Sequence, residues 1–249
     1  MSFKPIYRLL DWIKNEDLYL DTLIYNEYAV DILIELEEIP DYYDNHIWIA
    51  LSSNPNAIDL LEKNKDNIHW SNLSANPNAI HLLEQNLDKI NWSNLSANPN
   101  AIRLLEKNQD KICWSNLSGN PNAIHLLEQN PDKIDWEILS SNENAIHLLE
   151  QNQDEIDWFL LHLNENAIHL LEEYPDDILW DEFRFYENPN AIHLLEKHPD
   201  EIYWCLLGKN PNAIHLLEQN PDKINWNNLS ENPNAIRLLE KNQDKICWS

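Results

Sequence analysis

The stretch NPNAIHLLEQNLDKINWSNLSA, residues 76–97, is one copy of a motif that recurs nine times in this chain of 249 residues. The copies begin at nine asparagines: Asn54, Asn76, Asn98, Asn120, Asn142, Asn164, Asn188, Asn210 and Asn232. Seven of the eight intervals between them span twenty-two positions, and the interval from Asn164 to Asn188 is two positions longer. A fixed period of this length is typical of a solenoid, in which each unit packs only against its neighbours.

Ten of the first seventeen positions are identical in all nine copies. In the copy from Asn76 they are Asn76, Asn78, Ala79, Ile80, Leu82, Leu83, Glu84, Asp88, Ile90 and Trp92. One unit has too few apolar side chains to offset the entropy of ordering its backbone, which costs about 1–2 kcal/mol per residue. Stability therefore has to come from stacking one unit on the next.

The beginning of each copy predicts a helix of roughly ten residues that starts at the first asparagine. Asparagine is a favoured N-cap, and proline suits the first helical position, whose N–H has no partner. Two copies carry Glu143 and Glu165 instead of proline, and acidic residues interact favourably with the helix dipole there. The eleventh residue, Asn86 in the reference copy, is expected to end the helix in the left-handed conformation.

The second half of each copy allows two interpretations. Trp92 and Leu95 keep helical spacing, which favours a short helix capped by Asp88 with Trp92 as the repeated core residue. Ile90 and Trp92 are two residues apart, which is also the spacing of a strand. We expect the helix, and therefore an all-α fold: an α-solenoid of stacked short helix–turn–helix repeats with a period of twenty-two positions.

We expect two parts in the chain. Residues 54–249 hold the nine repeats, the last of them incomplete, and residues 1–53 form a divergent N-terminal cap made of decayed repeats. The segment from Asn26 to Leu33 keeps the repeat skeleton. At the other end the chain stops inside a unit, which is expected to leave Trp248 partly exposed and available for homodimer formation.

The composition narrows the classes of partner. Forty-three acidic and seventeen basic residues give a formal net charge of −26, which repels nucleic acid and anionic membrane surfaces and favours a basic protein partner. The three cysteines, Cys113, Cys205 and Cys247, have no metal-binding or disulfide spacing and indicate a reducing compartment. With no apolar run of membrane-spanning length, the sequence predicts an intracellular protein.

The sequence shows no nucleophile–base pair, phosphate loop or metal-spaced Cys/His cluster, so we expect no enzyme activity, no catalytic residue, no cofactor and no metal site. Six histidines share the variable sixth position: His81, His125, His147, His169, His193 and His215. They predict an exposed stripe that could sense pH or bind a metal. Packed helices are about 8–10 Å apart, which is far for two rings to share one zinc ion, so a solvated face is favoured.

The copies between Asp135 and Lys209 have drifted from the others, and one of them contains the two-residue insertion. Aromatic residues beside an arginine are typical of the hot spots of protein interfaces. The predicted protein-contact residues are Phe159, His162, Arg184, Tyr186 and Tyr203. The alternative is that neighbouring units simply repacked around the insertion.

The string NPNAIHLLEQNPDKINW, from Asn210 to Trp226, resembles tandem repeats in proteins of large DNA viruses of amoebae, such as marseilleviruses and mimiviruses. The similarity extends from Asn54 to Ser249. The resemblance implies a viral protein that acts in the host cytoplasm or nucleus or is packaged in the virion, and it assigns no functional residues. We therefore expect a non-catalytic scaffold that binds a host or viral protein. The alternative is a structural virion component that self-associates through its C-terminal end.

Overall fold

The computed structural model describes residues 41–175, 178, 180 and 183–246, and of residues 41–45 and 183–184 it describes only the backbone. Residues 1–40 of the predicted cap and Trp248 lie outside the described residues. All regular elements in the described part of the chain are helices, so the predicted α-solenoid is confirmed. The chain divides into two compact units, residues 1–129 and 130–249, and each is described by itself.

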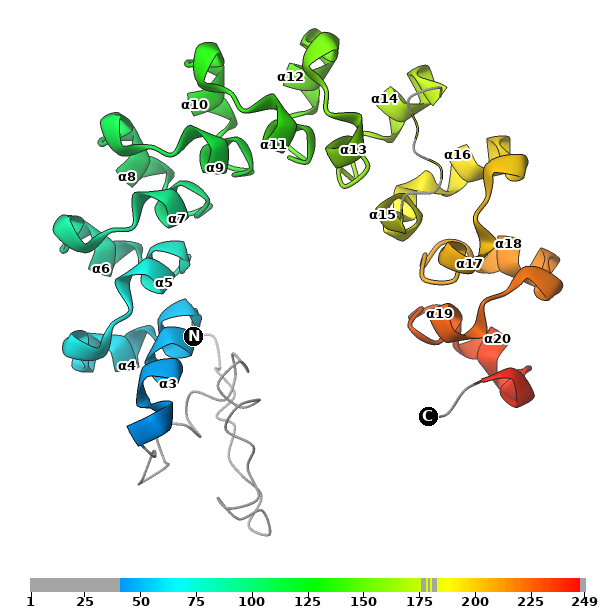
Figure 1. The fold of residues 1–249 in the computed structure, drawn as a ribbon, viewed down its shortest axis with the longest axis horizontal. Coiled ribbons are helices and arrows are strands. Elements are labelled where there is room, and N and C mark those ends of the chain that lie inside the picture. Colours follow the sequence, from blue (N-terminus) through cyan, green and yellow to red (C-terminus); the bar gives the residue numbers. More distant parts are fainter. Residues whose placement is uncertain (1–40, 176–177, 179, 181–182, 247–249) are drawn as a thin grey trace, which may run out of the picture. The chain divides into compact units, whose positions relative to one another are not determined.

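Within each unit the α-helices alternate between two rows (Figure 1). In the first unit the odd row consists of α3 (Asp41–Ser53), α5 (Trp70–Ala75), α7 (Trp92–Ser96) and α9 (Trp114–Ser118). The even row consists of α4 (Ile58–Lys63), α6 (Ile80–Glu84), α8 (Ile102–Glu106) and α10 (Ile124–Glu128). Successive odd helices pack on one another, and each also packs on the even helix that follows it.

The second unit continues the same alternation. Its odd row consists of α11 (Trp136–Ser140), α13 (Trp158–Leu161), α15 (Phe183–Glu187), α17 (Trp204–Leu207) and α19 (Trp226–Ser230). Its even row consists of α12 (Ile146–Gln151), α14 (Ile168–Glu173), α16 (Ile192–Lys197), α18 (Ile214–Gln219) and α20 (Ile236–Glu240). Short 3₁₀ turns follow the even helices: η2 (Lys65–Asn67), η3 (Leu87–Lys89), η4 (Gln109–Lys111), η5 (Pro131–Lys133), η6 (Gln153–Glu155), η9 (Pro199–Glu201), η10 (Pro221–Lys223) and η11 (Gln243–Lys245).

The first helix of each repeat is shorter than predicted and begins later. Asn76 to Ala79 form a turn in which Oδ1 of Asn76 accepts the N–H of Asn78 at 3.0 Å, and α6 begins only at Ile80. Ala79, with φ −93° and ψ 4°, separates the turn from the helix. The asparagine therefore caps a turn, because its side chain bonds the second following N–H. The predicted start is right only at Asn188, where η8 (Pro189–Ala191) runs into α16.

The predicted left-handed ending is wrong. Asn86 has φ −137° and ψ 52°, and no described residue has a positive φ. Its side-chain Nδ2 instead donates to the carbonyl of Leu82 at 2.8 Å. The helix ends because this amide takes over a carbonyl that the next helical turn would otherwise use.

The second half of the repeat combines both interpretations. After η3, Ile90 and Asn91 are extended, and α7 then begins at Trp92. The N-cap is Asn91, whose side chain accepts the N–H of Asn94 at 3.0 Å, and Asp88 lies exposed in the turn. The extended residues form no sheet in the described part of the chain, so the expected helix is confirmed, three to four residues later than Asp88.

Leucine and alanine fill the space between the two rows. In most odd helices the apolar side chain at the twentieth repeat position is fully inaccessible, such as Leu73, Leu95 and Leu117. Most even helices bury a leucine pair such as Leu82 and Leu83, and the alanine before each helix is also buried. The tryptophans are only half-buried, so their predicted role as the repeated core residue is wrong.

A buried serine at the twenty-first position connects successive odd helices. Oγ of Ser74 donates to the carbonyl of Trp70 at 2.7 Å and accepts the N–H of Asn91 at 3.0 Å. Ser52, at the end of α3, accepts the N–H of His69 in the same way at 2.9 Å. The last helix of the predicted cap therefore meets the first repeat through the same contact that joins the repeats.

A ladder of buried asparagines runs through each unit. Nδ2 of Asn98 donates to the carbonyls of Ser74 and Asn76, both at 3.0 Å, while its Oδ1 accepts the N–H of Asn100. Asn76, Asn120, Asn164, Asn210 and Asn232 make the same pair of bonds to the preceding repeat. Each of these asparagines thus stabilises its own turn through Oδ1 and binds the preceding repeat through Nδ2.

The insertion interrupts this ladder. Asn188 is buried and its Oδ1 still accepts the N–H of Asn190 at 2.9 Å, but its Nδ2 has no hydrogen-bond partner among the described residues. It follows Asn164 two positions later than the usual period, so the preceding carbonyls are out of register. A buried amide without a partner destabilises the fold, since its desolvation is not offset.

The ladder predicts unequal effects of one substitution at two sites. Asn98→Ala should lower the free energy of unfolding by about 2–4 kcal/mol, because the turn and two inter-repeat hydrogen bonds are lost. Asn188→Ala should cost about 1 kcal/mol or less, because only the turn bond is lost and an unpaired amide is removed. Urea denaturation followed by circular dichroism measures both. Equal losses would show that the inter-repeat bonds of Asn98 add no net stability.

Candidate functional site

The histidine stripe on the even row is paired with glutamates. Nε2 of His81 lies 2.8 Å from Oε1 of Glu62, the corresponding atoms of His125 and Glu106 are also 2.8 Å apart, and about half of each side chain is exposed. The same contact joins His169 to Glu150, His193 to Glu172 and His215 to Glu196. These partly exposed pairs connect neighbouring repeats and contribute modestly to stability.

Glu172 has a second partner. Its carboxylate also accepts from Nζ of Lys197 at 2.8 Å, and this hydrogen bond lowers the pKa of Glu172. Among the described residues no group of three or more His, Cys, Asp or Glu side chains could hold a metal ion. The stripe therefore has the geometry of an inter-repeat contact.

A second repeated surface lies along the tryptophans. Nζ of Lys89 lies over the ring of Trp70 at 4.6 Å from its centroid, and Lys111 lies over Trp92 at 4.8 Å. In the second unit Lys223 covers Trp204 at 4.3 Å and Lys245 covers Trp226 at 4.9 Å. Each lysine ends a 3₁₀ turn and is the nineteenth residue after its tryptophan. These cation–π contacts are a second link between neighbouring repeats.

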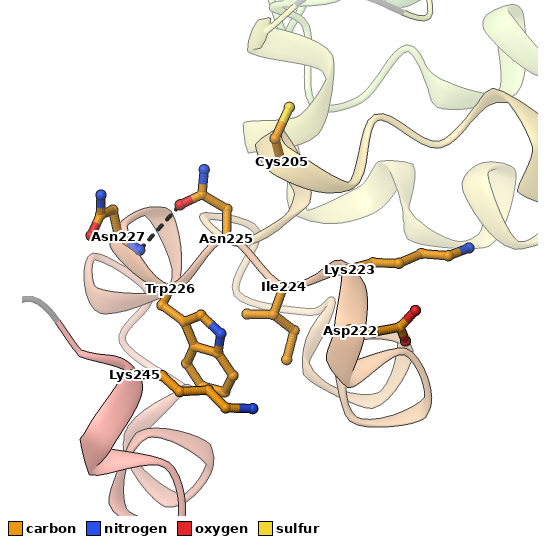
Figure 2. A pocket seen from close by; sticks show the side chains of 8 residues that line it. All are labelled: Cys205, Asp222, Lys223, Ile224, Asn225, Trp226, Asn227 and Lys245. Atoms are coloured by element: carbon orange, nitrogen blue, oxygen red, sulfur yellow. Dashed lines mark hydrogen bonds between the residues drawn. The ribbon is translucent and has the colours of Figure 1, made fainter.

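Figure 2 shows the groove beside one such pair, with a volume of about 470 Å³. Lys245 extends along the ring of Trp226, and Cys205 lies on the neighbouring helix. The other lining residues are Asp222, Lys223, Ile224, Asn225 and Asn227. In this regular repeat the groove is polar and contains lysines and asparagines.

The drifted repeats, residues 135–209, change this surface. The Ser–Asn pair at positions eighteen and nineteen, such as Ser93 and Asn94, becomes Phe159 and Leu160 in α13 and Cys205 and Leu206 in α17. The lysine that ends the 3₁₀ turn becomes Glu155 in η6 and Glu201 in η9. The odd row therefore becomes more apolar and more acidic in the same repeats.

Two of the five predicted contact residues lie on this surface. Phe159 is 50% exposed and Tyr203 is 48% exposed, on or next to α13 and α17. Arg184 lies within α15, and its side chain is outside the described part of the structure. His162 and Tyr186 have no accessible surface, so they are out of reach of a partner and are removed from the contact surface.

His162 and Tyr186 occupy the position of the buried serine. Nδ1 of His162 lies 2.5 Å from the carbonyl of Trp158, which corresponds to the carbonyl that serine bonds elsewhere. The hydroxyl of Tyr186 donates to the carbonyl of Glu201 at 3.0 Å and accepts the N–H of Tyr203 at 2.8 Å. The rings of His162 and Tyr186 each pack edge-on against Phe185. Both aromatic residues are therefore internal connectors near the insertion.

Burial raises the pKa of Tyr186 to about 12. In the unfolded chain tyrosine loses its proton near pH 10, so the folded state loses stability as the pH rises from about 10 to about 12. Tyr186→Phe removes this proton together with two hydrogen bonds. The difference in unfolding free energy between the natural protein and this variant should narrow by about 2 kcal/mol over that range. Urea denaturation at several pH values measures it, and a constant difference would contradict the assignment.

The sequence interpretation missed Leu160, Leu206 and Glu155. Aligning the copies reveals all three, because Leu160 and Leu206 each replace a polar asparagine and Glu155 replaces a basic lysine. Ile138, which lies in α11 at repeat position nineteen, is a further apolar residue in place of asparagine. We call Ile138, Phe159, Leu160, Tyr203 and Leu206 the apolar strip.

No helix in the described residues is long and apolar enough to cross a membrane. Comparisons with protein-family models, curated proteins and solved structures gave no match. The resemblance to viral repeats and the predicted compartment therefore stay predictions. The predicted self-association depends on Trp248, which is outside the described residues.

Proposed function

We propose that this protein is a non-catalytic scaffold that binds another protein through the apolar strip on the odd row of its second unit. The supporting observation is that leucines of the strip replace asparagines that form inter-repeat hydrogen bonds in the regular repeats. Asn94 and Asn228, at position nineteen, each donate from Nδ2 to the carbonyl of a residue on the preceding odd helix, at 2.8 and 2.5 Å. Leucine at this position in α13 and α17 cannot make that bond.

Burial compensates for this loss only in part. Leu160 and Leu206 keep part of their surface exposed, and Phe159 and Tyr203 are about half exposed. Replacing an amide that joins two helices with a partly exposed apolar group lowers solubility, which a repeat under selection for folding alone would not favour. A partner that covers the strip would recover the apolar burial.

The partner should be elongated and basic. Phe159 on α13 and Tyr203 beside α17 are separated by α15 along the row, so a ligand touching both extends beyond one helix spacing of about 8–10 Å. Exposed carboxylates surround the strip, among them Glu137, Asp154, Glu155, Asp200 and Glu201. Charge complementarity with these groups favours a partner with lysine or arginine side chains and speeds its association.

The test restores the residues of the regular repeats. A variant with Phe159→Ser, Leu160→Asn, Tyr203→Asn and Leu206→Asn should keep the fold, because the same residues occupy these positions elsewhere in the chain. Its affinity for the partner should fall at least about tenfold, since exposed aromatic anchors contribute most of the energy of such interfaces. Quantitative affinity capture followed by mass spectrometry, at about 0.05 and 0.5 M salt, measures this.

The matched control is Leu87→Gln, which also replaces an exposed apolar side chain, 42% accessible, by the residue found at Gln109. It should leave capture unchanged. Proteins retained equally by the restored variant and by the natural chain would refute binding through the strip. Circular dichroism of each variant separates loss of binding from loss of fold.

A further inference from the structure

The lysine–tryptophan pairs show which ligand these tryptophan faces accept. In all four pairs described above an ammonium group lies 4.3–4.9 Å from the ring centroid. The lysine always comes from the next repeat, as the last residue of a 3₁₀ turn and at the same separation from its tryptophan. The chain thus supplies an internal cation to these rings.

One tryptophan of the drifted repeats lacks this cation. Glu155 ends η6 at that same separation from Trp136, the first residue of α11, so a glutamate occupies the repeat position that lysine holds in the four pairs. Both residues belong to the second unit. No lysine or aromatic ring covers Trp136 among the described residues, and its side chain is partly exposed. The ring face and the carboxylate together match an ammonium group.

The residues predicted to surround Trp136 and Glu155 also favour a cation. Glu137, Asp154 and Asp157 occupy the repeat positions of Cys205, Asp222 and Asn225, which line the groove in Figure 2. Glu137, Asp154 and Glu155 are exposed, and Asp157 is partly exposed while capping α13. The lysine of the preceding 3₁₀ turn is Lys133, and its Nζ lies 3.8 Å from Oδ2 of the neighbouring Asp132. The site therefore combines an aromatic face with an excess of negative charge.

We propose that Trp136 and Glu155 bind a lysine side chain of the partner, which takes the place of the internal lysine of the regular repeats. This inference rests on the proposed function and specifies its chemistry. Phe159 lies on the next odd helix, about 8–10 Å along the row. A partner segment in the polyproline II conformation advances about 3.1 Å per residue and returns to the same face every third residue, so its lysine and the apolar residue that meets Phe159 should be about three positions apart.

The experiment uses a fluorescent peptide with a lysine and a leucine three positions apart, and the same peptide with acetyl-lysine. Binding is measured by fluorescence anisotropy at low salt on the full chain. The lysine peptide should bind the natural protein, and acetylation should weaken it about tenfold, because the charge needed for the cation–π contact and the ion pair is lost. Equal affinity of the two peptides would overturn the proposal.

Substitutions then locate the site. Glu155→Lys installs the internal lysine of the regular repeats and should weaken binding about tenfold, while the milder Glu155→Gln should weaken it about threefold. The matched control is Glu218→Lys, an exposed residue of α18 on the even row, which makes the same change in net charge. It should change affinity less than about twofold. Equal weakening by both lysine variants would overturn the proposal.

The two proposals can fail separately. If restoring the strip abolishes capture of the partner while Glu155→Lys leaves peptide binding unchanged, the scaffold stands and lysine recognition at Trp136 is wrong. If Glu155→Lys weakens the peptide while the restored strip still captures the same proteins, the cation site is supported and the strip is not the binding surface. Glu155→Lys is expected to fold, since lysine is the residue of the regular repeats at that position.

Discussion

The structure depends on one buried amide per repeat. The asparagine at the first position must accept a hydrogen bond from its own turn and donate two to the turn before it, as Asn98 does. Aspartate would place a carboxylate against two carbonyl oxygens, and serine has neither the reach nor the second donor. Since the two acceptors, on Ser74 and Asn76, lie at fixed separations before Asn98, the bond geometry itself fixes the period of the repeat.

The same constraint explains where the array tolerates change. An insertion between two asparagines moves the acceptors out of register and leaves Nδ2 of Asn188 without a described partner. The neighbouring connectors are also different there: His162 and Tyr186 replace serine, and Gly208 follows at the next equivalent position. A side chain at Gly208 would begin 2.9 Å from the backbone nitrogen of Leu229, so α19 approaches α17 too closely for serine. The repeats on either side of the insertion are therefore joined by contacts that differ from the serine contact of the other repeats.

The sequence was sufficient for the period, the all-α class and the buried leucines, because these follow from spacing and hydrophobicity alone. It was insufficient for the helix boundaries, since these depend on local asparagine side-chain bonds, such as those of Asn76 to the N–H of Asn78 and of Asn86 to the carbonyl of Leu82, which spacing and hydrophobicity do not show. The identity of a residue in all copies also did not reveal its burial. Trp92 is present in every copy but is only partly buried and lies under a lysine of the next repeat, whereas Leu95 is the residue that fills the core. His162 and Tyr186 were predicted as contacts because aromatic residues in the segments around Arg184 have the composition of an interface hot spot, although the serine that they replace is buried.

Function in such an array has to be built from positions that the ladder leaves free. Positions eighteen and nineteen of the odd helices and the last residue of each 3₁₀ turn can change without altering any bond of the buried asparagines. The drifted repeats changed all three kinds of position together, toward apolar residues on the helices and toward Glu155 and Glu201 in the turns. Repacking around the insertion accounts for His162 and Tyr186, which are internal. It does not account for Phe159, which is half exposed in the repeat before the insertion, or for the reversal of charge at Glu155, which removes a link between repeats and gains no described partner in return.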